Sequence, residues 1–380
     1  MNEPLAPGTA ASCDEAVDPD ERLTVHFLPD YTDANPYQDR LAAALRDRGV
    51  TVRVTPGGGG LFPLLGGVLG PGRPDVAHVH FLHQYLTPAG TRFPRLLAVL
   101  MAARTLFELA VLRVLGVSLV WTAHDLLNHE RRAVEVERWT KHCFLRLLAD
   151  EVVVHCEAAK RELLDCYRLP DEVAERMTVV PHGTFAGEYP AEVDRADARE
   201  RLGLPADATV FTFFGSIRRY KQVPELVRAV DALDGVHLLV AGNPRTETVE
   251  REVRDAAAAA GTVHLALEFV PDEEVQVYMA AADAVVLPFR AGERSMLTSG
   301  SVLLAMSFGR AVVAPDIGCI GAYVGDGGVV YEPGELEAAL ERALAADLDA
   351  MGERARTRAA ALDWDGVAAD TLSVYRAARR

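Results

Sequence analysis

The sequence has no long apolar segment, no paired cysteine motif and almost no lysine. A membrane-spanning helix needs about eighteen or more apolar residues in a row, and none are found, so we expect a soluble or at most peripheral protein. The five cysteines are odd in number and include no C-x-x-C pair, which argues against both a zinc site and a disulfide framework and indicates a reducing, cytoplasmic compartment. Residues 1–20 lack a basic segment followed by an apolar one and are predicted to be a disordered acidic tail, not a signal peptide.

Positive charge is also scarce, and lysine occurs only at Lys141, Lys160 and Lys221. The chain has 55 acidic and 39 basic residues, which give a formal net charge of -16. A field of this sign repels nucleic acid, so no nucleic-acid partner is expected. Arginine in place of lysine, with many acidic residues, is typical of the acidic proteomes of halophiles and also of GC-rich genomes with an acidic bias.

Valine-rich strand patterns alternate with amphipathic helix patterns, and the alternation occurs twice along the chain. It predicts an α/β protein with parallel sheets covered on both faces, arranged as two Rossmann-like domains that face each other across a cleft. We expect one domain at residues 21–187, completed by a C-terminal helix at 364–380, and a second at 188–363. The polar segment through residues 191–197 is predicted to be part of an irregular linker.

A glycine and two cations follow the first strand of the second half. Gly215 lets the main chain approach a phosphate, and Arg218 and Lys221 can stabilise the negative charge of a diphosphate leaving group. A solvated basic loop is an equal explanation of this cluster when it is taken alone.

Hydroxyl residues open the helix that follows the strand pattern at 284–289. Thr298, Ser299, Gly300 and Ser301 place main-chain amides and side-chain hydroxyls at its start. These can simply cap the helix, or they can bind an anion at the positive end of the helix dipole. Two such elements at the ends of neighbouring strands favour the anion site.

Asn35 and Tyr37 follow the first strand of the first half, in a segment that is either a loop lining the cleft or an ordinary Asn-Pro turn. His78 and His80 lie on one face of a later strand because alternate residues share a face. Further zinc ligands are missing, so His80 is an acceptor-side candidate and no metal site is predicted.

A polar cluster ends the strand pattern at 117–124 and is the best catalytic candidate of the first half. His124, Asp125 and Glu130 lie where doubly wound sheets keep their active sites. A capped turn into the next helix is the structural alternative.

Three segments carry a resemblance to a known family: FGSIRRYKQVPELVRAV, YMAAADAVVLPF and TSGSVLLAMSFGRAVVAPDIG. They resemble the donor-binding half of GT-B glycosyltransferases, close to the large retaining family four, the group 1 glycosyltransferases. The resemblance implies a hexosyltransferase that moves a hexose from a GDP- or UDP-sugar to a saccharide or lipid-linked saccharide in polysaccharide or glycoconjugate synthesis. It also implies that Arg218 and Lys221 grip the donor diphosphate and that His124 contacts the donor sugar.

The sequence departs from the family pattern at several positions. Many members have arginine directly after the glycine, where this chain has Ser216. The usual pair of glutamates is replaced by Met296 and Leu304, so Glu293 is a candidate substitute for the first, and the turn at 298–300 is expected to do more of the phosphate binding.

Two mechanisms and two other functions stay open. A retaining enzyme can let the leaving phosphate take the acceptor proton, whereas an inverting one needs a carboxylate base, for which Asp125 and Glu130 are the nearest choices. The alternatives are a nucleotide-sugar epimerase of GT-B shape and a non-catalytic paralogue that binds nucleotide sugars. No Asp-x-Asp ends a strand, so metal-independent transfer without a cofactor is expected.

The segment at 93–115 is strongly apolar and is predicted to be a buried helix. The resemblance adds that this half of related enzymes often docks on a membrane to reach lipid-linked acceptors, which implies peripheral contact at the inner face of the cell membrane.

Overall fold

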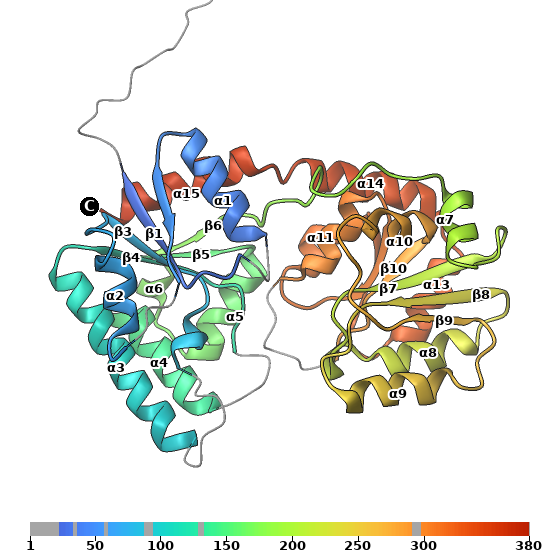
Figure 1. Cartoon of the computed structure of the whole chain (residues 1–380), viewed down its shortest axis with the longest axis horizontal. Coiled ribbons are helices and arrows are strands. Elements are labelled where there is room, and N and C mark those ends of the chain that lie inside the picture. Colours follow the sequence, from blue (N-terminus) through green and yellow to red (C-terminus); the bar gives the residue numbers. More distant parts are fainter. Residues whose placement is uncertain are drawn as a thin grey trace, which may run out of the picture.

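The computed structural model describes residues 23–32, 36–56, 60–86, 94–127, 133–290 and 298–379. These residues form two lobes, each built on a parallel six-stranded sheet with helices on both faces (Figure 1). The prediction of an α/β protein with two doubly wound sheets is confirmed.

The first lobe has the strand order β2-β1-β3-β4-β5-β6. Its strands are β1 (Thr24–Leu28), β2 (Thr51–Val54), β3 (Val76–Val79), β4 (Ser118–Thr122), β5 (Glu151–Val154) and β6 (Met177–Val179). Its helices are α1 (Tyr37–Asp47), α2 (Pro63–Leu69), α3 (Pro94–Val114), α4 (Val134–Leu147), α5 (Glu157–Tyr167) and α6 (Asp171–Ala174), with a 3-10 turn, η2, at Leu82–Tyr85. Because both faces of the sheet are covered, β3 to β5 are almost wholly buried, which explains their continuous valine-rich runs.

The second lobe has the strand order β12-β11-β10-β7-β8-β9. Its strands are β7 (Thr209–Phe214), β8 (Val236–Ala241), β9 (Val263–Ala266), β10 (Ala284–Val286), β11 (Ala311–Pro315) and β12 (Gly328–Tyr331). Its helices are α7 (Arg195–Arg201), α8 (Val223–Asp231), α9 (Glu247–Ala257), α10 (Val275–Ala281), α11 (Gly300–Ser307), α12 (Ile320–Val324), α13 (Leu336–Leu344) and α14 (Leu348–Ala360), with a 3-10 turn, η3, at Arg219–Lys221.

Each sheet has a point where the strand order reverses, between β1 and β3 in the first lobe and between β7 and β10 in the second. Doubly wound sheets bind their ligands at the carboxyl ends of the strands beside this point. We therefore expect ligand-binding residues in the segments that follow β1, β3, β7 and β10.

The last helix, α15 (Trp364–Ala378), returns to the first lobe and lies along α1 (Figure 1). The Tyr375 side chain is fully buried there, and its hydroxyl lies 2.6 Å from Nδ1 of His78. The main-chain carbonyl of Ala378 accepts a hydrogen bond from the Ser118 hydroxyl at 2.9 Å. The end of the chain thus completes the core beneath the first sheet.

The two lobes are joined by a disulfide that the sequence analysis did not predict. Cys156, directly before α5, is bonded to Cys319, directly before α12, and their Cα atoms lie 5.7 Å apart. The expectation that the cysteines form no disulfide is wrong, because 163 residues separate this pair and only the packing of one lobe on the other brings them together.

Two further expectations are corrected by the structure. The segment at 191–197 is not irregular throughout, because α7 begins at Arg195, where Oδ1 of Asp194 accepts a hydrogen bond from the Ala196 amide at 2.8 Å. The apolar helix α3 is not buried all round, since Leu100, Phe107 and Val114 are exposed on its outer face. The opposite face of α3 packs into the core, and the apolar residues of its outer face are in contact with solvent.

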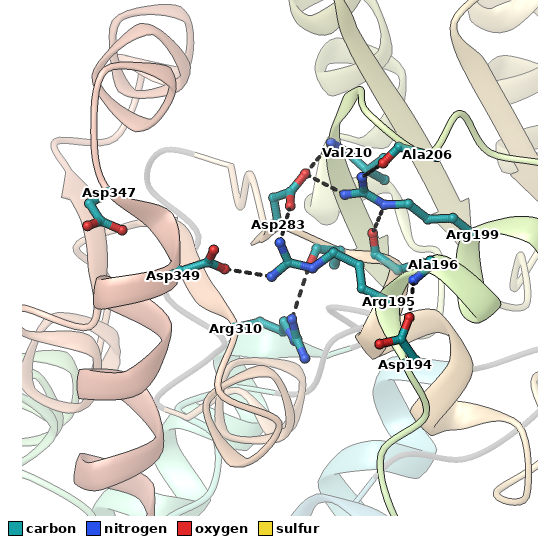
Figure 2. Close-up of polar contacts among 12 residues, drawn as sticks. Asp194, Arg195, Ala196, Arg199, Ala206, Val210, Asp283, Arg310, Asp347 and Asp349 are labelled. Carbon is teal, nitrogen blue, oxygen red and sulfur yellow. Dashed lines mark hydrogen bonds and ion pairs between the residues drawn. The ribbon is translucent and has the colours of Figure 1, made fainter.

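An ion-pair network anchors α7 and the preceding linker to the second lobe (Figure 2). Arg199 is almost completely buried, and its guanidinium donates to Asp283 at 2.8 Å and to the carbonyls of Ala281 and Ala206 at 3.2 and 2.6 Å. Arg195 bridges Asp283, at 3.1 Å, to Asp349 on α14, at 2.6 Å. All three nitrogens of the buried Arg199 guanidinium are therefore satisfied, which a charge removed from water requires.

We expect Arg199→Met to lower the free energy of unfolding of the second lobe by about 1 to 3 kcal/mol, because Asp283 keeps Arg195 as a partner but the carbonyls of Ala281 and Ala206 lose their buried donor. The measurement is chemical denaturation followed by circular dichroism. The matched control is Arg254→Met, which removes a solvent-exposed pair with Glu250 and should cost no more than about 0.5 kcal/mol. Equal effects of the two substitutions would contradict the role given to the network.

Candidate functional site

The segment after β7 and the start of α11 meet at the switch point of the second sheet. Gly215 has a φ of +122°, a conformation that favours glycine, and a Cβ at this position would lie 2.7 Å from Oγ of Ser301 and 3.5 Å from Nζ of Lys221. Gly242, at the end of β8, abuts it, since a Cβ there would lie 2.0 Å from the carbonyl oxygen of Gly215. The main chain after β7 thus lies directly against the hydroxyl that begins α11.

Two hydroxyl groups of these segments are buried without hydrogen-bond partners among the described residues. They are Oγ of Ser216 and Oγ1 of Thr298. Ser299 is the N-cap of α11, yet its side chain accepts no capping hydrogen bond. Simple helix capping by Ser299 therefore does not account for this hydroxyl-rich turn, and two buried hydroxyls remain able to donate to a ligand.

The two cations predicted to bind a diphosphate have no carboxylate partner among the described residues, whereas Arg219 between them forms an ion pair with Glu252 at 2.6 Å. The Lys221 side chain is only 7% exposed, which argues against a solvated basic loop. Burial and, to a lesser extent, the positive charge of Arg218 lower the pKa of Lys221 to about 8. An anion placed between these groups would neutralise two charges that repel each other.

The helix α11 carries no acidic side chain, and the Leu304 side chain is buried in the core of the second lobe. The position where the family has its second glutamate is therefore part of the packing here. Glu293 and Met296 lie outside the described residues.

In the first lobe, the structure gathers the predicted His80, His124 and Tyr37 into one buried cluster. His80 follows β3, His124 lies just beyond β4, and Tyr37 is the first residue of α1. The Tyr37 ring lies 4.7 Å from the ring of His124 and 5.8 Å from that of His80, measured between centroids. Tyr37 is thus packed among the histidines, while Asn35 lies outside the described residues.

Two members of this cluster, His155 after β5 and His182 after β6, were not among the predicted site residues. Both are buried, and their rings lie 5.7 and 4.7 Å from that of Tyr37. The signal was present, since a histidine comes at or shortly after the end of four neighbouring strands in turn. Burial lowers the pKa of His155 to about 4 and that of His182 to about 3, so the rings are neutral near pH 7.

Asp125, the predicted base, lies beside this cluster and is half-buried. Nζ of Lys141 lies 2.8 Å from the carbonyl oxygen of Leu126, which holds the turn after β4 in place. Glu130 lies outside the described residues, so its position relative to Asp125 is not described.

The first-lobe cluster and the second-lobe hydroxyl turn border the same seam between the lobes. The Tyr323 hydroxyl, on α12, accepts from the main-chain amide of His182 and donates to the carbonyl of His155, both at 3.0 Å. Phe185 lies under the start of α11, 3.7 Å from where a Cβ on Gly300 would be. The seam thus joins the carboxyl ends of strands from both sheets.

The described residues include no group of three or more histidine, cysteine or acidic side chains that could hold a metal ion. None of the described helices is long and apolar enough to cross a membrane.

Two family models match the chain, one in each half. Residues 34–184 match Glycosyltransferase Family 4, and residues 208–349 match Glycosyl transferases group 1. Together these matches cover most of both lobes.

Curated relatives support the same family. The chain is 30% identical over 262 residues to a D-inositol 3-phosphate glycosyltransferase of Kineococcus radiotolerans, which covers 60% of this chain and 58% of that protein. It is 29% identical over 326 residues to a GDP-mannose:glycolipid 4-beta-D-mannosyltransferase of Xanthomonas campestris pv. campestris, covering 84% and 82%. The chain spans 58%, 63% and 53% of the length of three of these inositol phosphate enzymes.

The fold has solved counterparts. The chain superposes on the Anabaena protein HepE, solved in complex with UDP-glucose, with a TM-score of 0.67 at 17% identity over 93% of this chain and 100% of that one. This similarity, together with the two sheets, establishes the GT-B fold.

We expect the affinity for inorganic pyrophosphate to fall as the pH rises above about 8, because free Lys221 then loses its proton and its positive charge. Below that pH the lysine is already charged, so its contribution to the affinity should be nearly constant. Isothermal titration calorimetry at a series of pH values measures this, and the difference in affinity between the wild type and Lys221→Met should shrink above about pH 8, because the ionisation of pyrophosphate itself affects both proteins alike. A difference that stays constant through this range would contradict the placement of Lys221 at the anion site.

Proposed function

Because this chain belongs to the group 1 glycosyltransferases of family four type, with the GT-B fold, we propose that it transfers a hexose from a nucleoside diphosphate sugar to a saccharide or lipid-linked saccharide. The observation that carries the proposal is that, among the described residues, Arg218 and Lys221 have no carboxylate partner and the buried hydroxyls of Ser216 and Thr298 have no hydrogen-bond partner. Departure of the nucleotide builds negative charge on its diphosphate, and preorganised cations and hydroxyl donors stabilise that charge.

The substrates are proposed from the relatives. HepE was solved with UDP-glucose, and the Xanthomonas relative is named for GDP-mannose and a glycolipid acceptor. A GDP- or UDP-sugar donor and a glycolipid or saccharide acceptor are consistent with these names. The Kineococcus relative, named for D-inositol 3-phosphate, adds a phosphorylated polyol as a further acceptor of the same hydroxyl chemistry.

In the proposed reaction, Arg218 and Lys221 stabilise the negative charge that develops on the donor diphosphate. If the anomeric configuration is retained, a phosphate oxygen held by Arg218 and Lys221 can itself take the acceptor proton. If it is inverted, Asp125, directly after His124, would be the base. Because the two cations and the helix start supply the positive charge, we propose that transfer needs no metal ion.

We expect Arg218→Ala and Lys221→Ala each to lower kcat about a hundredfold or more, the effect of removing one group that stabilises transition-state charge. The assay follows release of nucleoside diphosphate from GDP- and UDP-sugars with a glycolipid acceptor, and mass spectrometry identifies the products.

The matched control is Arg219→Ala, which removes a cation of the same loop that is 62% exposed and paired with Glu252. It should retain nearly wild-type kcat, and wild-type activity should persist in EDTA. Wild-type rates in both the Arg218 and Lys221 variants would refute the proposed function. A changed sugar still attached to its nucleotide would identify an epimerase instead, and binding without turnover would identify a non-catalytic protein.

An apolar surface on the first lobe supports peripheral contact with a membrane. The surface consists of the exposed apolar side chains of α3 and α4, which pack side by side (Figure 1). They are Leu96, Val99, Leu100, Phe107, Val114, Trp139 and Leu147. Basic residues outnumber acidic ones over residues 94–148, although the whole chain is strongly acidic. Arg95 and Arg146 of these helices are exposed and form no ion pair among the described residues, and such side chains beside an apolar surface suit an anionic lipid surface, where a lipid-linked acceptor would lie.

We expect Phe107→Glu to weaken binding to phosphatidylglycerol vesicles about tenfold, the effect of losing one inserted aromatic side chain. Vesicle co-sedimentation measures the binding. The control is Phe269→Glu, which adds the same charge at an exposed apolar position of the second lobe and should leave vesicle binding unchanged. Equal binding by the wild type and the Phe107 variant would exclude this surface as the contact.

A further inference from the structure

Three histidines at the ends of adjacent strands form a continuous hydrogen-bonded chain in the first lobe. His80, His124 and His155 follow β3, β4 and β5, which are neighbours in the sheet. Nδ1 of His80 lies 3.2 Å from Nε2 of His124, and Nδ1 of His124 lies 3.4 Å from Nε2 of His155. Nδ1 of His155 lies 3.0 Å from the carbonyl oxygen of Val180.

The protonation of each ring follows from this last contact. A carbonyl oxygen only accepts, so Nδ1 of His155 must carry the hydrogen. The ring is neutral because burial lowers its pKa, so Nε2 of His155 has a bare lone pair. Nδ1 of His124 must then donate to it.

The hydrogen positions on His124 and His80 follow in the same way. Burial and the neighbouring histidines hold the pKa of His124 well below its ordinary value, so its ring is neutral and its Nε2 must accept from Nδ1 of His80. The pKa of His80 is lowered in the same way, which leaves Nε2 of His80 as a bare acceptor. That nitrogen is buried and has no hydrogen-bond partner among the described residues. One main-chain carbonyl thus determines the hydrogen positions of three side chains.

We propose that His155 and His80 are positioning residues that hold His124 as the Nδ1–H tautomer with both of its ring nitrogens hydrogen-bonded inside the lobe. His124 then has no ring nitrogen to offer a ligand. The Phe81 ring stacks on it at 4.8 Å between centroids, with an interplanar angle of 18°, and Tyr37 meets it edge-on. The ring is therefore held in one orientation by its two hydrogen bonds and by these two ring contacts.

The direct test is nitrogen NMR of the full chain labelled with 15N-histidine, because long-range 1H–15N correlations distinguish the two neutral tautomers. We expect all three rings to carry hydrogen on Nδ1 at neutral pH, with signals assigned from His80→Gln, His124→Gln and His155→Gln. A His124 ring with hydrogen on Nε2, or one exchanging between tautomers, would overturn the proposal. This measurement needs no substrate, so its failure is separate from failure of the proposed function.

The activity test rests on the proposed function and compares two substitutions of His155. Gln places an amide near the position of Nε2, where its oxygen can accept from His124, whereas Leu fills similar space and accepts nothing. We expect His155→Leu to lower kcat about tenfold to a hundredfold, the scale of a misplaced active-site group, with a KM for the donor within about threefold of the wild type. His155→Gln should stay within about threefold of the wild-type kcat.

Equal losses in the two variants would show that only packing matters and would overturn the positioning role. The histidine control is His237→Gln, on β8 of the second lobe, where the ring contacts only His264 among the described histidines and neither rate nor tautomers should change. If the Leu variant does not fold, the positioning role is tested by the NMR tautomers and by the kcat of His155→Gln. A loss of about tenfold in the kcat of His155→Gln would contradict the proposal.

Discussion

Uncompensated positive charge at the switch point of the second sheet is the constraint on which the rest of the site depends. A chain with a net charge of -16 has many carboxylates available, yet none of the described ones pairs with Arg218 or Lys221, while Arg219 takes Glu252. Holding a buried lysine beside an arginine is unfavourable unless an anion completes the site. The glycine after β7 and the close approach of α11 bring Ser301 and Lys221 together, and two nearby segments carry buried hydroxyls without a partner among the described residues.

The side chains at the carboxyl ends of the strands differ in charge between the two lobes. The second lobe collects positive charge at its strand ends, which suits a phosphate. The first lobe collects neutral rings at its strand ends, and burial keeps them uncharged. A neutral, rigid wall opposite a charged one fits a substrate with an ionic half and an uncharged half, as a nucleotide sugar is. The ion pairs of α7 and the return of α15 hold each half of this arrangement to its own core.

The local pattern of apolar residues was enough to predict most of the fold and part of the candidate site. The alternation of valine runs and amphipathic helices predicted both sheets, because the period of the apolar residues reports directly which faces are buried. Short elements such as β12, α12 and α13 were missed, since a few residues carry too little periodicity. Gly215, Lys221 and Ser301 could be placed at one strand edge from topology alone. The role of His155 could not be predicted, because it depends on the carbonyl of Val180, which lies beyond the next strand. The Cys156–Cys319 disulfide could not be predicted either, because it depends on how the two sheets pack against each other. The buried face of α3 was overestimated because apolar composition does not tell core from an outer surface.

The covalent link between the lobes also changes the connectivity of the molecule. Together with the main chain it closes a ring that contains α5, β6, the linker and the strands β7 to β11. A single protease cut anywhere within that ring leaves the pieces bonded to each other, so the lobes would separate only after reduction. The ring also limits how far the lobes can move apart near α5 and α12, so any larger opening must pivot about that corner and widen the opposite side of the seam.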